Sequence, residues 1–96
     1  MHWTKQLVYP ITPKSGPMRG METLIDANRA ISEDLPKSFL KRHHWFSAET
    51  LLVRASVTGV DGDIKRATDE LLKAVEREGW MSRDVSTSSL RRARVG

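Results

Sequence analysis

The apolar residues between Asp63 and Gly79 recur at intervals of three and four, and no other feature constrains the fold of this 96-residue chain as strongly. This spacing places them along one side of an α-helix. Asp61 or Asp63 is expected to cap the start of the helix, and Gly79 to end it in a left-handed conformation. The sequence therefore predicts a helix over residues 62–79. Its apolar side consists of Ile64, Ala67, Leu71, Ala74 and Val75.

A second helix with the same apolar spacing is predicted over residues 44–58. Gly59 offers a stop, and residues 58–62 form a connection short enough to join antiparallel neighbours. We therefore expect a helical hairpin whose apolar sides face each other, with the N-terminal half of the chain covering them. The apolar side of this helix consists of Trp45, Ala48, Leu51, Leu52 and Ala55.

The N-terminal residues favour a short β-hairpin. The segment 5–11 is rich in β-branched and aromatic residues, and Pro10 within it indicates an edge strand because proline cannot donate a ladder hydrogen bond. Residues 12–17 have the composition of a turn, and residues 18–22 are expected to return as a second strand. Because a two-stranded hairpin is marginally stable alone, we expect it to lie against helices.

A third helix is predicted over residues 23–35. Thr23 and Asp26 have the spacing of a capping box, with Asp in place of the usual Glu. Pro36 should end the helix because the residue before a proline is pushed out of the α region. Residues 37–44 are polar and basic, and we interpret them as a connector with room for one helical turn. The apolar side of this helix consists of Leu24, Ala27, Ala30 and Ile31.

Together these elements predict a single α+β domain over residues 1–81, with a short N-terminal two-stranded β-hairpin packed on three α-helices. A chain of this length allows one domain with one modest core. We expect that core to contain Val8, Leu24, Ala27, Ile31, Trp45, Ala48, Leu52, Ile64, Ala67, Leu71 and Val75.

Residues 82–96 differ in composition and are expected to form a disordered, basic tail rich in serine and arginine. They contain four arginines and one aspartate, which supply +3 of the net charge of +4 carried by the whole chain. The basic excess therefore belongs to the tail and not to the predicted domain. Two interpretations of the segment 90–94 stay open, a solubilising role and loose binding of an acidic partner or nucleic acid.

The sequence offers little material for catalysis or membrane insertion. It has no cysteine, which excludes disulfides, a thiolate nucleophile and a Cys-based zinc site. It has no phosphate-binding Gly loop, no nucleophile motif, no signal peptide and no apolar run approaching the ~18 residues of a membrane span. Carboxylate pairs such as Glu33 with Asp34 and Glu76 with Glu78 have no evident cause for a pKa shift. We therefore expect a cytoplasmic protein without catalytic, cofactor-binding or metal-binding residues, and not an enzyme.

A basic and aromatic segment ahead of the second helix is the best candidate for an interaction surface. Basic residues interleaved with Phe39 and Trp45 are able to follow a phosphate backbone and stack bases. The alternative is that these aromatics belong to the core and the charges to a solvated face. The adjacent His43 and His44 point about 100° apart on a helix, so they are poorly spaced to bind one metal ion. The candidate surface comprises Lys37, Lys41, Arg42, His43, His44, Phe46 and Arg54.

Two functional hypotheses follow. The first is a small non-enzymatic protein-interaction or regulatory module, acting on an unknown protein partner or as a homodimer, because a complete small core comes with no site chemistry. The second is an RNA- or single-strand-binding accessory protein that uses the candidate surface and the Arg-rich tail. A helix-turn-helix is disfavoured, because the predicted turn is long and the helix over residues 62–79 has five acidic against four basic residues.

The order of certain apolar and turn residues between positions 3 and 81 is distinctive. They are Trp3, Val8, Ile11, Met21, Ala27, Pro36, Trp45, Ala48, Ile64, Ala67, Leu71, Ala74, Glu78 and Gly79. This order resembles a small bacterial family of unknown function, made of free-standing domains of under about a hundred residues with a short β-hairpin followed by helices. The chain departs from the family pattern at Leu35, where an aromatic residue is usual, and at the inserted residues 38–44. The resemblance implies an architecture and no activity, cofactor or partner.

Overall fold

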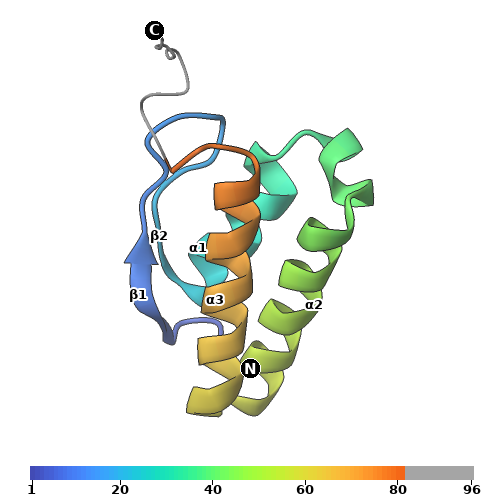
Figure 1. The fold of residues 1–96 in the computed structure, drawn as a ribbon. Coiled ribbons are helices and arrows are strands. Elements are labelled where there is room, and N and C mark those ends of the chain that lie inside the picture. Colours follow the sequence, from blue (N-terminus) through green and yellow to red (C-terminus); the bar gives the residue numbers. More distant parts are fainter. Residues whose placement is uncertain (82–96) are drawn as a thin grey trace, which may run out of the picture.

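A computed structural model describes residues 1–81 and shows an N-terminal β-hairpin followed by three helices (Figure 1). The predicted α+β fold class is therefore confirmed. In Figure 1, α2 is the outermost helix and lies beside α3, while β1 lies on the other side of α3. The predicted tail, residues 82–96, lies outside the described residues. The elements are β1 (Gln6–Ile11), β2 (Met21–Thr23), α1 (Leu24–Arg29), α2 (His43–Thr58) and α3 (Asp61–Arg77).

The hairpin of α2 and α3 forms the larger part of the fold. At the end of α2, Gly59 adopts a φ of 65° and its N–H donates a 2.8 Å hydrogen bond to the carbonyl of Ala55. The predicted acidic cap of α3 is wrong, because the N-cap residue is Val60 and no side chain caps it. Asp63 instead accepts a 2.6 Å hydrogen bond from the Thr58 hydroxyl across the turn.

The end of α3 has the predicted left-handed glycine. Gly79 has a φ of 79°, and its N–H donates to the carbonyl of Glu76 while the N–H of Trp80 donates to the carbonyl of Val75. These two hydrogen bonds make a Schellman motif, which satisfies carbonyls at the helix end. The reversed chain brings the Trp80 carbonyl to 2.8 Å from the N–H of Lys14, so the loop between the strands is fastened to the end of α3.

The predicted capping box begins α1. The Thr23 hydroxyl accepts a hydrogen bond from the N–H of Asp26, and the Asp26 carboxylate accepts one from the N–H of Thr23. Each side chain therefore satisfies a backbone donor that the first turn leaves free. The same carboxylate also accepts from the N–H of Glu22, and these bonds lower the pKa of Asp26.

The helical segment after α1 ends at the predicted proline. α1 continues as a π-helical turn over Ala30–Asp34, and Leu35 follows with an extended backbone. That conformation is the one a residue before Pro36 adopts most easily. The connector then holds a 3-10 helix over Lys37–Lys41, which is the single helical turn that its composition left room for.

β1 and β2 pair antiparallel with an irregular register. The prediction that Val8 belongs to the core is wrong: Val8 is 53% exposed, whereas Leu7 and Ile11 are buried. Side chains alternate between the two faces of a strand, so the choice of Val8 assigned the wrong face of β1 to the core. The backbone N–H of Val8 nevertheless donates a 3.2 Å hydrogen bond to the hydroxyl of Thr68, which joins β1 to α3.

The other residues of the predicted core are all buried. Two polar side chains, Ser56 and Thr68, are buried among them, and their hydroxyls donate to backbone carbonyls at 2.7 and 2.8 Å. Both groups are therefore satisfied within their own helices. Buried residues beyond the predicted set are Leu7, Ile11, Met18, Met21, Ala30, Leu35, Ala55 and Ala74.

Candidate functional site

The predicted interaction surface does not form one patch. Lys37 and Lys41 lie exposed on the 3-10 helix. Arg42 and His44, at the start of α2, are instead bound to the end of α3 through their side chains. The basic residues of this segment are therefore divided between solvent and an internal contact.

The remaining members of the predicted surface lie along α2. His43 and Phe46 are exposed in its first turn, whereas Arg54 lies about two turns beyond Phe46. The guanidinium of Arg54 is 3.7 Å from the carboxylate of Asp63, at the opposite end of the helical hairpin. Arg54 is thus too distant to join the lysines in a single basic surface.

Arg42, His44 and Trp45 converge on the carboxylate of Glu78, and we call these four residues the Glu78 cluster. Arg42 Nη1 donates to both carboxylate oxygens at 2.8 and 3.0 Å. Trp45 Nε1 donates to Oε2 at 2.9 Å, and His44 Nε2 lies 3.0 Å from the same oxygen. The Glu78 side chain is only 8% exposed, so this set of hydrogen bonds and opposite charge is what allows it to stay ionised there.

Two opposing influences act on the pKa of Glu78. Burial raises it, but the hydrogen bonds from Trp45 and His44 together with the charge of Arg42 outweigh burial, so the pKa lies below its ordinary value of 4.5. A carboxylate with a lowered pKa is ionised at neutral pH and is a poor general acid. The cluster therefore has the properties of a structural contact that joins the start of α2 to the end of α3.

Contacts between aromatic rings extend this structural contact. The Arg42 guanidinium lies 4.2 Å from the centre of the Phe39 ring, Phe39 stacks on Trp80, and Trp80 lies 6.0 Å from Trp45. The Trp45 ring is fully buried, and the partly buried Phe39 ring is in contact with Arg42 and Trp80, so neither ring is a free platform for bases. Sequence reasoning missed Glu78, and the one signal was an acidic residue next to the glycine that ends α3, where the helix dipole favours a base.

A groove lies between the first half of α2 and the second half of α3. It consists of two adjoining pockets of about 330 and 410 Å³, which share His43, Ser47 and Glu70. The residues that line the smaller pocket are all polar or charged, whereas the surface of the larger pocket is mainly apolar. The smaller pocket adds His44, Lys73 and Arg77, and the larger one adds Phe46, Thr50 and Leu51.

Ser47 and His43 in this groove do not have the geometry of a nucleophile and its base. Ser47 Oγ lies 3.4 Å from His43 Nε2, beyond the roughly 2.6–3.2 Å that such a pair needs. Within residues 1–81, no carboxylate is hydrogen-bonded to His43 to orient its ring. The pair gives no support to nucleophilic catalysis.

The charges of the polar pocket are largely compensated. Lys73 lies 3.5 Å from Glu70, and His44 is bound to Glu78. In the part of the chain that the structure describes, no group of three His, Asp or Glu side chains is arranged to hold a metal ion. Arg77, which also lines this pocket, adds one positive charge that no ion pair within residues 1–81 compensates.

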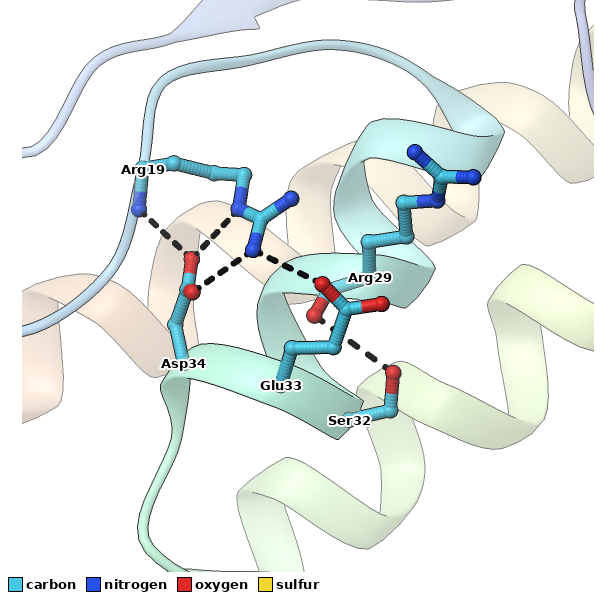
Figure 2. A network of polar contacts seen from close by, with 5 residues as sticks. All are labelled: Arg19, Arg29, Ser32, Glu33 and Asp34. Carbon is cyan, nitrogen blue, oxygen red and sulfur yellow. Dashed lines mark hydrogen bonds and ion pairs between the residues drawn. The ribbon is translucent and has the colours of Figure 1, made fainter.

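Arg19 organises a separate polar network at the end of the helical segment that follows α1 (Figure 2). Its guanidinium donates to both oxygens of Asp34 at 2.7 and 2.8 Å and to Glu33 at 3.0 Å. The expectation that the carboxylates have no cause for a pKa shift is wrong for Glu78, as shown above, and also for Asp34, because the Arg19 hydrogen bonds lower the pKa of Asp34. This network fastens the loop before β2 and leaves Asp34 ionised.

The outer face of α2 carries an exposed apolar row. We define this face as Phe46, Thr50, Val53 and Val57, whose spacing of four, three and four residues places them on one side of the helix. Phe46 is 61%, Val53 43% and Val57 57% exposed. Sequence reasoning missed the two valines, although their spacing is helical, because the inner face offered a longer apolar row.

No helix within residues 1–81 is long and apolar enough to cross a membrane. Comparisons of the chain with protein-family models, curated proteins and solved structures found no match. The resemblance to a small bacterial family therefore stays a prediction, and function has to be inferred from the surfaces of the molecule.

Proposed function

We propose that this protein is a small non-enzymatic protein-interaction module that binds its partner through the outer face of α2. The observation that carries the proposal is the exposure of Phe46, Val53 and Val57 on one side of a helix whose other side forms the core. A row of exposed apolar side chains on one side of a folded helix is typical of a site that another protein covers. We propose the cytoplasm as its location, since the chain has no cysteine that an oxidising compartment would pair.

The outer face is supported rigidly from behind. Trp45 and Leu52 on the opposite side of α2 are fully buried, and the Glu78 cluster fixes the start of the helix. A partner therefore binds a helix that is already ordered, which reduces the conformational entropy lost on binding. Phe46 is an aromatic side chain of the kind that is enriched in protein interfaces relative to the rest of the surface.

The spacing of the outer face also indicates the kind of partner. A row with spacings of four, three and four residues, in which all members except Thr50 are apolar, packs most readily against a helix that presents the same spacing. We therefore propose a helical apolar partner surface. The groove beside it, with Leu51 and Ser47, would lie at the rim of such a contact.

Nucleic-acid binding has less support. Of the aromatics that would stack on bases, Trp45 is fully buried and Phe39 is partly buried and stacked on Trp80, and the charge of Arg42 is neutralised by Glu78. Lys37 and Lys41 remain exposed, but two lysines provide few phosphate contacts.

The proposal is tested by site-specific photo-crosslinking in the cell that makes the protein. A photoreactive phenylalanine analogue at Thr50 should form an adduct of defined mass, because this position lies within the outer face. The matched control is the same analogue at Thr12, an exposed threonine in the loop between the strands.

The adduct at Thr50 should disappear when Val53 and Val57 are both replaced by serine. Equal adducts from Thr50 and Thr12, or a Thr50 adduct that survives the double substitution, would overturn the assignment of this face. Crosslinks to RNA instead of protein would favour the nucleic-acid alternative.

A further inference from the structure

We propose that the partner of the outer face is a second copy of this chain, with the two α2 helices running parallel. The inference rests on the proposed function, because it names the partner for the same surface. Its separate support is the arrangement of charge on either side of the apolar row.

The outer face has the spacing of a coiled-coil seam. Phe46, Thr50, Val53 and Val57 follow one another at four, three and four residues, which corresponds to heptad positions d, a, d and a. The seam is short, at about 16 Å. An isolated helix of this length would be marginal, but α2 is held folded by the rest of the domain, so only docking of two ordered helices is required.

Glu49 and Arg54 lie beside the seam on opposite sides. With Phe46 at position d, Glu49 falls at position g and Arg54 at the following position e. In a parallel pair, the g residue of one helix faces the e residue five positions later in its partner. Glu49 of each copy would therefore face Arg54 of the other, and two-fold symmetry produces this opposite-charge pair twice.

The same charges disfavour an antiparallel pair. In that arrangement the two g edges meet each other, and so do the two e edges. Glu49 would then share an edge with a second Glu49, and Arg54 with a second Arg54. Like charges along one edge select against this orientation.

Both charged residues are available for the contact. Within residues 1–81, Glu49 makes no ion pair or hydrogen bond through its side chain. Arg54 has a side chain that is 70% exposed and lies 3.7 Å from Asp63. Because exposed ion pairs of this length contribute little, the guanidinium is free to turn toward a partner.

The size of the seam sets the expected affinity. A standard interface buries about 800 Å² per partner, and three exposed apolar side chains and a threonine supply only part of that. We therefore expect a reversible dimer with a Kd in the micromolar range.

The experiment is sedimentation of the full chain over a concentration series with charge-reversed variants. Glu49→Arg and Arg54→Glu should each weaken self-association at least about tenfold, because each replaces two attractions by two repulsions. The double variant with both reversals should recover it, and a mixture of the two single variants should form a heterodimer. Arg66→Glu, an exposed charge reversal on α3, is the matched control and should have no effect.

The outcomes separate this inference from the proposed function. A wild-type chain that stays monomeric at several hundred micromolar, about a hundredfold above the expected Kd, overturns the second copy as partner and leaves the outer face for another protein. If Val53→Ser and Val57→Ser abolish self-association but the charge reversals leave it unchanged, only the parallel pairing is overturned. If neither set of substitutions changes self-association, the inference is overturned and the outer face is excluded as the dimer interface.

Discussion

The inner and outer faces of α2 carry apolar residues at the same helical spacing, yet one is buried and the other is exposed. On the inner face, Trp45, Ala48, Leu52 and Ala55 are buried completely. On the outer face, Phe46, Val53 and Val57 are between 43% and 61% exposed. The comparison shows that periodicity identifies a helix, whereas the neighbouring elements determine which side becomes core.

The Glu78 cluster explains how the helix is rotated to bury the inner face. The indole N–H of Trp45 donates to a carboxylate on α3, so Trp45 can enter the core without an unsatisfied donor. Phe46, the next residue in the chain, lies on the other side of the helix and is exposed. A polar contact at the start of α2 thereby helps to set the register of its apolar faces.

Substitution of the inner face should have the largest effect on stability. Leu52→Ala should lower the free energy of unfolding by about 2–5 kcal/mol, because it removes buried methyl groups and leaves a cavity. Val53→Ala, one residue away on the outer face, should change it by less than about 0.5 kcal/mol. Urea denaturation measures both, and equal losses at the two positions would mean that the helix is rotated differently.

Removal of the Glu78 carboxylate should reduce stability less than truncation of the inner face. Glu78→Ala should lower the free energy of unfolding by about 1–3 kcal/mol, because the buried indole N–H of Trp45 loses its acceptor. The tryptophan fluorescence of the folded state should change as well. Glu76→Ala, an exposed acid two residues earlier, is the control; a similar loss from both substitutions would contradict a specific role for Glu78.

The dependence of stability on pH should reveal the contribution of the Glu78 carboxylate. The pKa values of Glu78 and Asp34 lie below their ordinary values of 4.5 and 3.8, so these carboxylates contribute stability that is fully present above those values. That contribution is lost as the pH falls through the lowered pKa values of the folded state, so stability should be flat above about pH 5 and decrease below about pH 4. Glu78→Gln should make the decrease shallower in acid unfolding followed by circular dichroism. An unchanged slope would exclude Glu78 as a cause.

Substitution of the outer face should have the smallest effect on the folded chain. Val53→Ser together with Val57→Ser should leave the free energy of unfolding at high dilution within about 0.5 kcal/mol, because both side chains are exposed and Val and Ser have similar helix propensities. Urea denaturation at micromolar and at higher concentration measures this. A loss above about 2 kcal/mol at high dilution, the size of a core truncation, would place the valines in the core.

Much of the fold could be predicted from the sequence because its signals are local. The capping box of Thr23 and Asp26, the glycine that ends α3 and the proline at position 36 each act over a few residues. Val8 was assigned wrongly because strand alternation does not state which face is buried.

The candidate site was harder to predict because it depends on contacts across the fold. Arg42 and His44 looked free in the sequence, but their partner Glu78 lies more than thirty residues later. Phe46 was the one predicted surface residue that proved to lie on the outer face. Val53 and Val57 could have joined it only if the burial of the inner face had been known.

The most direct test of the central claim is a dilution series of the wild-type protein with methyl and aromatic chemical shifts recorded by NMR. If the outer face of α2 binds a second copy, the signals of Phe46, Val53 and Val57 should move with concentration while that of Val8, equally exposed on β1, stays fixed. Signals that move at Val8 and not on α2, or that do not move at all up to several hundred micromolar, about a hundredfold above a micromolar Kd, would contradict self-association through this face.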